Sequence, residues 1–394
     1  MTAPRRDVIL LSTADWDHPF WTNKQHVARS LAELGHRVLY IESLGLRAPR
    51  LEAQDLRRIL RRLRRGLRPP RRVAPGLWVW SPLLIPAPRT RFQQRLNRGL
   101  FRFLLTFWRR WLGLRADLFW TYNPLTGQLL DFERLAFRQL VYHCVDDLTA
   151  QPCMPAELIA AEEERLCRRA DRVFVTSLEL LRLRRAFNPR TSYYSNVADL
   201  DHFAVARDAQ TTIPADLQAI PGSRLGFIGA ISAYKLDLAL IERLARHRPD
   251  CQLVLIGRVG EGDPSTDLQS LQGLANVHLL GSRPYAELPA YLRGFDLALL
   301  PCPLNAYTRS MFPMKFFEYL AAGVPVVATD LPALREHSHL AHLCESPAAF
   351  VAAVDRLLLD PPGQGSRAPI PLELLPSGCS YRGRTEAMLA EITP

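Results

Sequence analysis

The hydrophobic pattern of the chain alternates between two kinds of segment. Short apolar runs bounded by polar residues or glycine are typical of strands buried in a parallel sheet, and apolar residues every three or four positions are typical of helices. The runs predict strands at 8–12, 37–41, 77–80, 118–121, 139–142 and 172–176, and then at 225–228, 252–256, 277–280, 296–300, 326–329 and 342–344. The helical spacing predicts helices at 24–34, 92–112, 124–134, 156–170, 236–246, 268–274, 286–293, 314–322, 348–359 and 381–392.

Strand and helix predictions alternate in two series, which is the pattern of α/β domains with doubly wound parallel sheets. A chain of 394 residues has room for two such domains, each with its own core. Segment 199–222 is rich in Asp, Thr, Pro and Ala and predicts the boundary between them. We therefore predict a first domain at 1–204, a second at 205–377 and a separate C-terminal helix within 378–394.

Segment 312–332, FPMKFFEYLAAGVPVVATDLP, is the most informative stretch of the sequence. Pro313 suits the first position of a helix, and Gly323 can supply the left-handed residue that ends it. Lys315 and Glu318 lie three positions apart and share one face of that helix. A cation, a carboxylate and free backbone N–H groups at a helix start could hold the phosphates and ribose of a sugar nucleotide. The alternative is an ordinary solvated ion pair, which would contribute little.

The segment before this helix favours the binding interpretation. The polar loop 304–311 follows the predicted buried strand 296–300. In open α/β sheets, ligands bind beyond the carboxyl ends of the strands. The predicted helix and the loop before it would therefore lie at the ligand-binding edge of the second sheet.

Cysteine content and hydropathy indicate the compartment. The seven cysteines are scattered, odd in number and contain no C-x-x-C pair, which favours a reducing cytosol over a disulfide framework or a structural zinc site. The first apolar run, 8–12, is too short for the core of a signal peptide. No run approaches the 18 apolar residues of a membrane-spanning helix.

Positive charge is concentrated in one part of the chain. Segment 50–115 holds 18 arginines and two acidic residues, a charge of +16, whereas the whole chain carries +11. Lysine is rare, and the three lysines are Lys24, Lys235 and Lys315. All three fall in segments that other features mark as ligand-binding, so we interpret them as candidates, with coincidence as the alternative. The compact ammonium group differs from the planar guanidinium in how it meets a phosphate.

The basic region also contains aromatic residues. Segment 57–72 reads RRILRRLRRGLRPPRR, and segment 98–115 interleaves phenylalanine and tryptophan with arginine. This composition predicts a surface that lies on anionic lipid. The alternative is a solvated arginine face with buried aromatic residues. Nucleic acid binding is disfavoured because no nucleic-acid motif accompanies the charge.

The loop after the first predicted strand, 15–24, mixes aromatic and polar residues. Tryptophan rings stack well on sugars, so we predict that this loop lines the acceptor side of the site. The candidate residues there are Asp17, His18, Trp21, Asn23 and Lys24. The alternative is that the aromatic side chains only anchor the loop.

Five segments together carry a family resemblance that covers nearly the whole chain. They are 15–42 (DWDHPFWTNKQHVARSLAELGHRVLYIE), 195–203 (SNVADLDHF), 225–238 (LGFIGAISAYKLDL), 312–336 (FPMKFFEYLAAGVPVVATDLPALRE) and 379–389 (CSYRGRTEAML). The chain resembles the large retaining group-one family of GT-B glycosyltransferases, in the branch of bacterial teichuronic-acid-type polysaccharide enzymes. The resemblance implies two Rossmann-like domains that face a cleft, with the C-terminal helix crossing back to the first domain.

The resemblance also implies roles for residues of the second domain. Glu318 matches the second glutamate of the family's Glu-x7-Glu motif, which binds the nucleotide ribose. Lys235 matches the basic residue that contacts the donor pyrophosphate, and Gly229 lies in the small-residue turn before it. By position, Lys315 is a further donor-binding candidate.

The family motif is incomplete in this sequence. Its first glutamate would fall at Ser310, so that carboxylate is missing. Asn305, Arg309 and Ser310 are candidates to replace it at the donor sugar, with Arg309 also compensating diphosphate charge. The departure leaves the identity of the sugar open, and to a lesser degree the retaining stereochemistry.

In the first domain, segment 141–147 (VYHCVDD) ends a predicted strand. His143 lies near the position where relatives carry a histidine that touches the donor sugar. His143, Asp146 or Asp147 could serve as a general base or bind a sugar hydroxyl. The alternatives are a hydrogen-bonded structural histidine and aspartates that cap the next element. We predict no metal, because no further carboxylates cluster nearby and basic side chains can neutralise a diphosphate.

These inferences predict a hexosyltransferase-type glycosyltransferase on the cytoplasmic side of the cell membrane. Lys235, assisted by Arg309 and Lys315, would stabilise the diphosphate leaving group. The predicted partners are a nucleotide sugar, a glycan or lipid-linked acceptor and an anionic membrane surface, with no nucleic acid and no cofactor. Two rivals stay open: a GT-B-like scaffold or glycan-binding subunit that has lost turnover, and a sugar-nucleotide epimerase.

Overall fold

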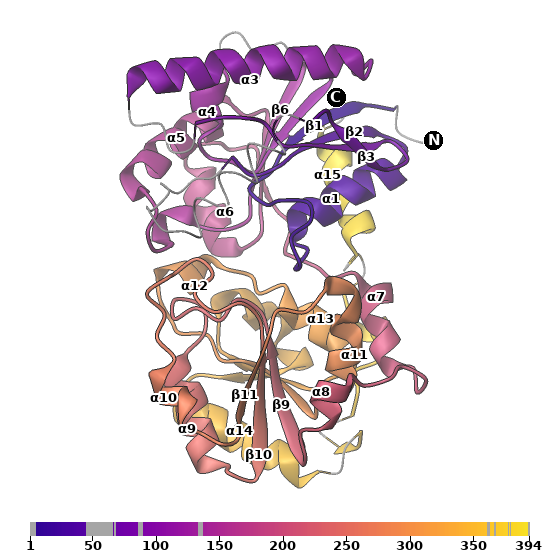
Figure 1. The fold of residues 1–394 in the computed structure, drawn as a ribbon, viewed down its shortest axis with the longest axis vertical. Helices are drawn as coiled ribbons and strands as arrows, with labels where there is room; N and C mark the ends of the chain where they lie inside the picture. Colours follow the sequence, from indigo (N-terminus) through magenta and orange to yellow (C-terminus); the bar gives the residue numbers. More distant parts are fainter. Residues whose placement is uncertain are drawn as a thin grey trace. The chain divides into compact units, whose positions relative to one another are not determined.

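The computed structural model describes residues 5–44, 66, 68–85, 90–132, 137–360, 363–365, 368–376, 378 and 380–392. The chain divides into two compact units (Figure 1). The first unit comprises Met1–Tyr194 and Thr385–Pro394, and the second unit comprises Ser195–Arg384. Most of the predicted basic run 57–72 lies outside the described residues.

The first unit is built on an eight-stranded sheet in the order β3-β4-β2-β1-β5-β6-β7-β8. Its strands are β1 (Asp7–Leu11), β2 (Arg37–Ile41), β3 (Arg71–Ala74), β4 (Leu77–Trp80), β5 (Leu118–Thr121), β6 (Gln139–Cys144), β7 (Arg172–Val175) and β8 (Thr191–Tyr193). Its helices are α1 (Asn23–Glu33), α3 (Arg91–Trp111), α4 (Thr126–Leu129), α5 (Ala156–Arg169) and α6 (Leu178–Arg185). All neighbouring strands run parallel except β3, which is antiparallel to β4. Every residue of β1 is buried, as expected for a strand covered on both faces.

The second unit is built on a six-stranded, all-parallel sheet in the order β11-β10-β9-β12-β13-β14. Its strands are β9 (Ser223–Ile228), β10 (Cys251–Ile256), β11 (Val277–Gly281), β12 (Leu297–Leu300), β13 (Val326–Thr329) and β14 (His342–Cys344). Its helices are α7 (Leu200–Ala204), α8 (Ala215–Gln218), α9 (Leu238–His247), α10 (Gln269–Gln272), α11 (Leu288–Arg293), α12 (Ala306–Ser310), α13 (Lys315–Ala321) and α14 (Pro347–Leu359). Counted within this unit, the strand order is 3-2-1-4-5-6, the classical Rossmann order.

The last helix, α15 (Tyr381–Ile392), contributes to the packing of the first unit with its final turns. Both carboxylate oxygens of Glu391 accept hydrogen bonds, from the hydroxyls of Ser192 and Tyr194. Gln139 Nε2 donates to the Ile392 carbonyl at 2.7 Å. The end of α15 is therefore fastened to the β6–β8 side of the first sheet.

The fold class predicted from the sequence, two α/β units with parallel sheets, is confirmed, and three local predictions are wrong. The helix expected at 124–134 is only the four-residue α4, because Leu130 has an extended backbone (φ −121°). Strands β3 and β8 were not predicted. β3 is a sheet edge with two exposed arginines, so it carries no apolar run.

Close packing in the second sheet depends on a glycine. A Cβ atom on Gly226, in the middle of β9, would lie 2.0 Å from the ring of Phe295. Gly226 therefore admits an aromatic side chain against the sheet.

Candidate active site

The sheet of the second unit has its topological switch point between β9 and β12. These strands are neighbours, but β10 follows on the far side of β9 and β13 on the far side of β12. The loops that leave the two carboxyl ends therefore diverge, and such a crevice is where ligands bind in open α/β sheets. The loops are 229–237 after β9 and 301–305 after β12, and they hold Gly229, Lys235 and Asn305 from the sequence prediction.

The loop after β9 is tightly held near the sheet. The Gly229 N–H donates to the Ile256 carbonyl at 2.9 Å. A Cβ atom on Gly257 would lie 1.7 Å from the Gly229 oxygen, so the two loops touch backbone to backbone. A turn closed by the Lys235 N–H and the Ser232 carbonyl follows, at 2.8 Å. The sequence therefore folds this segment into a compact turn ahead of α9.

Lys235 lies two residues before Asp237, whose side chain accepts a hydrogen bond from the Leu240 N–H and caps α9. Its ammonium nitrogen lies 5.3 Å from the ring centroid of Tyr234 and 5.2 Å from that of Tyr307. Burial raises the pKa of the nearby Cys302 thiol to about 12, and the charge of Lys235 opposes that shift. The half-buried ammonium group is thus positioned by two aromatic rings.

Asn305 joins the two loops. Its Nδ2 donates to the Tyr234 carbonyl at 2.9 Å, and its Oδ1 accepts from the Thr308 N–H as the N-cap of α12. Ser310 at the end of α12 is buried, whereas Arg309 is exposed. Asn305 therefore connects the loop after β9 to the start of α12.

Helix α13 carries the predicted ribose-binding carboxylate. Lys315 Nζ lies 2.5 Å from Glu318 Oε2, and Glu318 is 2% exposed against 16% for Lys315. The helix begins at Lys315, so the prediction that Pro313 is its first residue is wrong by two positions. As predicted, Gly323 follows the helix with a positive φ of 79°.

Tyr319 connects α13 to the end of β9. Its hydroxyl accepts from the Ile228 N–H at 2.8 Å and donates to the Ile228 carbonyl at 3.2 Å. Glu318 is the residue before Tyr319, and Gly229 is the residue after Ile228. This buried phenol therefore fixes the predicted ribose-binding helix against the start of the loop that carries Lys235.

The first unit has its own switch point, between β1 and β5, and three predicted residues gather there. The Tyr122 hydroxyl, just after β5, donates to Asn23 Oδ1 at 2.9 Å. Lys24 Nζ lies 6.0 Å from the centroid of the Tyr122 ring. His143, in β6, stacks on that ring with centroids 4.8 Å apart.

His143 is buried in an aromatic environment. Trp120 and Phe174 adjoin its ring in addition to Tyr122. Neither of its ring nitrogens has a hydrogen-bond partner among the described residues. Burial, with a smaller contribution from the charge of Lys24, lowers the pKa of His143 to about 3. The imidazole is therefore neutral at physiological pH.

The remaining candidates of the first unit are held by contacts within that unit. Asp17 pairs with Arg71 at 2.6 Å, and His18 Nδ1 lies 2.9 Å from the Phe20 carbonyl. Trp21 packs edge-on against Trp16, which supports the loop-anchoring interpretation.

The two aspartates after β6 differ in their environment. Asp146 lies two residues after the end of β6 and is half-buried. Asp147 accepts from the Thr149 N–H and caps a short 3-10 turn. The capping alternative therefore holds for Asp147.

Four tyrosines take part in these sites without having been predicted: Tyr122, Tyr234, Tyr307 and Tyr319. Two of them could have been predicted from the sequence. Tyr122 directly follows a buried strand, and Tyr234 is next to a candidate lysine. Tyr307 and Tyr319 depend on contacts between segments far apart in the sequence, and no sequence pattern marks them.

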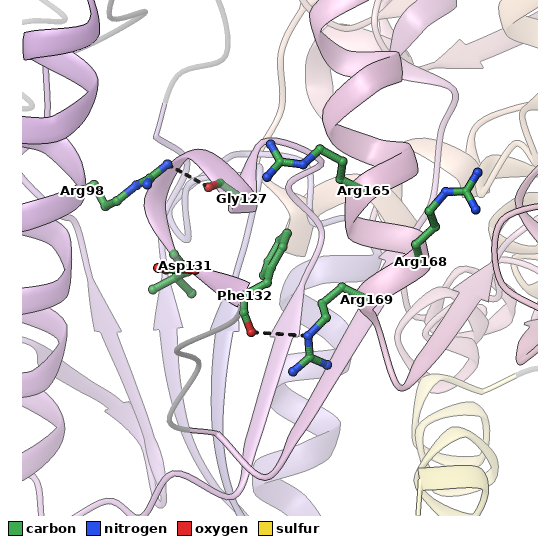
Figure 2. A pocket seen from close by; sticks show the side chains of 8 residues that line it. Arg98, Gly127, Asp131, Phe132, Arg165, Arg168 and Arg169 are labelled. Atoms are coloured by element: carbon green, nitrogen blue, oxygen red, sulfur yellow. Dashed lines mark hydrogen bonds between the residues drawn. The ribbon is translucent and has the colours of Figure 1, made fainter.

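A pocket of about 310 Å3 lies apart from all these residues, in the first unit (Figure 2). It is lined by Arg98, Gly127, Leu130, Asp131, Phe132, Arg165, Arg168 and Arg169. Within the described ranges, no three His, Cys, Asp or Glu side chains lie close enough together to hold a metal ion. The prediction that no metal is needed stays a prediction.

Comparison with known proteins finds a family match for one part of the chain. Residues 222–360, which include the β9–β12 switch point and α13, match the family of glycosyl transferases group 1. They form a group 1 glycosyltransferase domain. The chain is 30% identical over 266 residues to TuaH of Bacillus subtilis, a glycosyltransferase assigned to teichuronic acid biosynthesis. The matched region covers 62% of this chain and 64% of TuaH, so the chain spans less than two thirds of that relative.

Solved structures extend the similarity to the whole fold. Sucrose-phosphate synthase from Thermosynechococcus elongatus superposes with a TM-score of 0.67 at 17% identity, covering 97% of this chain and 94% of that chain. Anabaena HepE in complex with UDP and glucose gives a TM-score of 0.62 at 17% identity, covering 98% of this chain and 95% of that chain. Both have the GT-B fold, so the GT-B class predicted for this chain is confirmed.

Proposed function

We propose that this protein transfers a sugar from a nucleoside-diphosphate sugar to a hydroxyl group of a glycan or lipid-linked acceptor. The observation that carries the proposal is the switch point of the group 1 domain, where Lys235 and the Tyr319-anchored helix of Glu318 meet the end of β9. Similarity to TuaH and to HepE, which was solved with UDP and glucose, supports the same chemistry.

In this proposal each residue acts on a different part of the donor. Lys235 binds the diphosphate and stabilises the negative charge that develops as the bond to the sugar breaks. Glu318 accepts hydrogen bonds from the ribose hydroxyls, and the ion pair with Lys315 orients its buried carboxylate. The sugar keeps its anomeric configuration, as the family resemblance implies, and no protein nucleophile is assigned.

His143 fits a role in hydrogen bonding better than a role as general base. A neutral imidazole with a pKa of about 3 accepts protons poorly near pH 7. Its two nitrogens are buried in this structure, so hydrogen bonding to a sugar hydroxyl requires one of them to become accessible when the acceptor or donor binds. Asp146 is the remaining candidate for the base in the first unit.

We further propose that the acceptor is lipid-linked and that the protein works on the inner face of a bacterial cell membrane, in cell-surface polysaccharide synthesis. TuaH supports the polysaccharide setting. None of the described helices is both long enough and apolar enough to cross a bilayer.

Titration calorimetry with UDP and with GDP tests the donor site. Because one hydrogen bond to a charged group contributes about 1.5–3 kcal/mol, Lys235→Ala and Glu318→Gln should each weaken binding about 10–150-fold. Arg243→Gln and Glu287→Gln change exposed charges in the same unit and should leave the affinity unchanged. If Lys235→Ala and Glu318→Gln bind both nucleotides as tightly as the parent protein, the donor site is misplaced.

The presence of Ser310 in place of the motif glutamate favours one alternative, a subunit that binds nucleotide sugar without turnover. Release of UDP or GDP from a panel of nucleotide sugars separates the two functions. Release that depends on an acceptor supports transfer. Tight binding without release under any condition supports the inactive subunit.

A further inference from the structure

Helix α3 presents an apolar surface to solvent. Figure 1 shows it on the outer side of the first unit. Phe92, Phe103 and Trp111 are 74%, 67% and 63% exposed, and Leu96 and Phe107 are also exposed. At 3.6 residues per turn these five side chains fall within about 100° of the helix circumference. We call this set the apolar stripe.

The apolar stripe is not the face that packs on the sheet. The buried residues of α3 are Asn97, Phe101 and Leu105, which lie on another side of the helix. Phe101 stacks on Trp80, and the Asn97 side chain is hydrogen-bonded to the backbone of Ile85. Among the described residues, the core is therefore complete without the stripe, and an exposed apolar set of this size indicates an interaction surface.

The charge of α3 identifies what would cover the stripe. The helix contains six arginines and no acidic residue. Arg91, Arg95 and Arg102 lie on the flank beside the stripe and are exposed. A second copy of the chain would bring a second set of arginines against the first, which disfavours a dimer through this face. An anionic lipid surface offers apolar chains for the stripe and phosphates for the arginines.

The length and charge of α3 together indicate how this helix lies relative to a bilayer. At about 1.5 Å per residue the 21-residue helix is about 31 Å long, enough to cross the hydrocarbon layer. Arginines distributed along its length make crossing too costly, and no described helix qualifies as a span. A helix with an apolar stripe and a cationic flank lies in the plane of the interface instead.

The basic flank continues beyond the helix. Arg98 lines the pocket of Figure 2 with Arg165, Arg168 and Arg169 from α5. Asp131 also lines this pocket, and Arg165 and Arg168 pair with glutamates of their own helix. Arg169 uses Nε to bind the Phe132 carbonyl. The carboxylates offset most of the charge of Arg165 and Arg168, so mainly Arg98 and Arg169 add positive charge to the arginine flank here.

We propose that α3 docks the protein on an anionic phospholipid surface, with Phe92, Leu96, Phe103, Phe107 and Trp111 in the acyl–headgroup boundary and the arginine flank on the lipid phosphates. The proposal rests on the membrane setting of the proposed function and assigns it to one surface. Nucleotide binding by the second unit does not depend on it.

Sedimentation of the full-length protein with vesicles tests the docking. Vesicles of phosphatidylcholine with phosphatidylglycerol should bind the protein, and binding should fall with added salt and be weak on phosphatidylcholine alone. Phe92→Ser with Phe103→Ser should lower the partition coefficient at least tenfold. Arg91→Gln, Arg95→Gln and Arg102→Gln together should lower it on the order of a hundredfold.

Matched variants control for general changes of surface hydrophobicity and charge. Leu359→Ser with Leu374→Ser removes two exposed apolar side chains from the second unit. Arg185→Gln, Arg190→Gln and Arg243→Gln remove three exposed positive charges elsewhere. Both variants should bind vesicles within about twofold of the parent protein, because none of the five substituted residues belongs to α3. In addition, quenching of Trp fluorescence by brominated acyl chains should be reduced in Trp111→Phe.

Three results would overturn the proposal. One is equal vesicle binding by the parent and both α3 variants, or no binding by any. Another is loss of binding only in the arginine variant, which would mean adsorption by charge alone without insertion of the stripe. The third is a dimer that dissociates in the Phe92/Phe103 variant, which would make a second copy the occupant. UDP titration of the same variants separates this test from the proposed function, because a docking failure should leave nucleotide affinity unchanged.

Discussion

The three lysines occupy chemically different surroundings. Lys24 is buried beside Tyr122, Lys315 is paired with Glu318, and Lys235 lies against two tyrosine rings. Aromatic faces can hold an ammonium group in place. Of the three, Lys235 lies on the loop after β9 at the β9–β12 switch point, which is the expected place for a residue that binds a diphosphate.

The ring of Tyr307 should matter for nucleotide binding and its hydroxyl should not. Replacing the ring by Leu removes a cation–π contact worth about 0.5–2 kcal/mol and should weaken UDP binding about 2–30-fold. Tyr307→Phe keeps the ring and should bind like the parent in the same calorimetric titration. Equal losses in both variants would mean that the hydroxyl, not the ring, positions the site.

His143 should make the protein sensitive to acid. The unfolded chain binds a proton at this residue near pH 6.5, whereas the folded protein binds it only near pH 3. Acid therefore favours the unfolded state, and the stability present above pH 6.5 falls as the pH is lowered. Between pH 7 and pH 5 the loss should be about 2 kcal/mol.

Urea titrations at both pH values test this effect. His143→Phe should reduce the difference in unfolding free energy between pH 7 and pH 5, because the proton no longer distinguishes the two states. His339→Phe, at an exposed position, should leave the difference nearly unchanged. An unchanged pH dependence in His143→Phe would show that the folded and unfolded states bind this proton over the same pH range, and it would contradict the lowered pKa of His143.

At the scale of elements, the site depends on how β9, its following loop and α13 are fastened together. Tyr319 bridges α13 to Ile228, and Gly257 allows the loop after β10 to touch Gly229. Tyr319 and Gly257 are not themselves among the predicted donor-binding residues, whereas Gly229 is. Both keep the predicted phosphate and ribose contacts at a fixed separation.

Tyr319→Phe should weaken both stability and nucleotide binding. It leaves a buried N–H and carbonyl of Ile228 without their partner, which costs about 1–3 kcal/mol of unfolding free energy. Tyr291→Phe removes another buried hydroxyl of the same unit, hydrogen-bonded to Asp216 and Arg283, and is the matched control. Both variants should lose stability, but only Tyr319→Phe should lose UDP affinity.

Gly257→Ala should disrupt the loop that carries Lys235. Its Cβ would lie 1.7 Å from the Gly229 oxygen, so the backbone of the loop must move. Gly273→Ala meets no atom within 4 Å and should be tolerated. UDP affinity and thermal unfolding should both fall in the first variant and stay near the parent values in the second. Unchanged affinity in Gly257→Ala would separate this loop from the donor site.

For the whole molecule, the two units should respond differently to ligand. A nucleotide that binds only the second unit stabilises that unit by mass action, about 2.7 kcal/mol at a concentration of 100 times Kd. Hydrogen exchange with saturating UDP should therefore slow in segments 229–237 and 301–318. Exchange in α3 should not change. Protection confined to the first unit would contradict the assignment of the donor site.

Sequence patterns predicted the strands of the second unit well. Its six strands were predicted to within two residues, because buried parallel strands are continuous apolar runs between polar or glycine residues. The short edge strands β3 and β8 were missed, since an exposed or three-residue edge has no such run. Lys235, Lys315 and Glu318 could be nominated because they follow predicted strands or share a helix face.

The sequence by itself determined the α/β class, the two-unit organisation and the segments that reach the carboxyl ends of the strands, because hydrophobic period and turn chemistry are local properties. Only the tertiary structure decided which side chains meet across those segments: Tyr307 against Lys235, Tyr319 at the end of β9, and His143 between aromatic rings without a polar partner. It also decided that the apolar stripe of α3 faces solvent, since one amphipathic pattern allows burial against either a core or an external surface. Contacts between distant segments, desolvation and exposure arise from packing in three dimensions, and a one-dimensional pattern does not contain them.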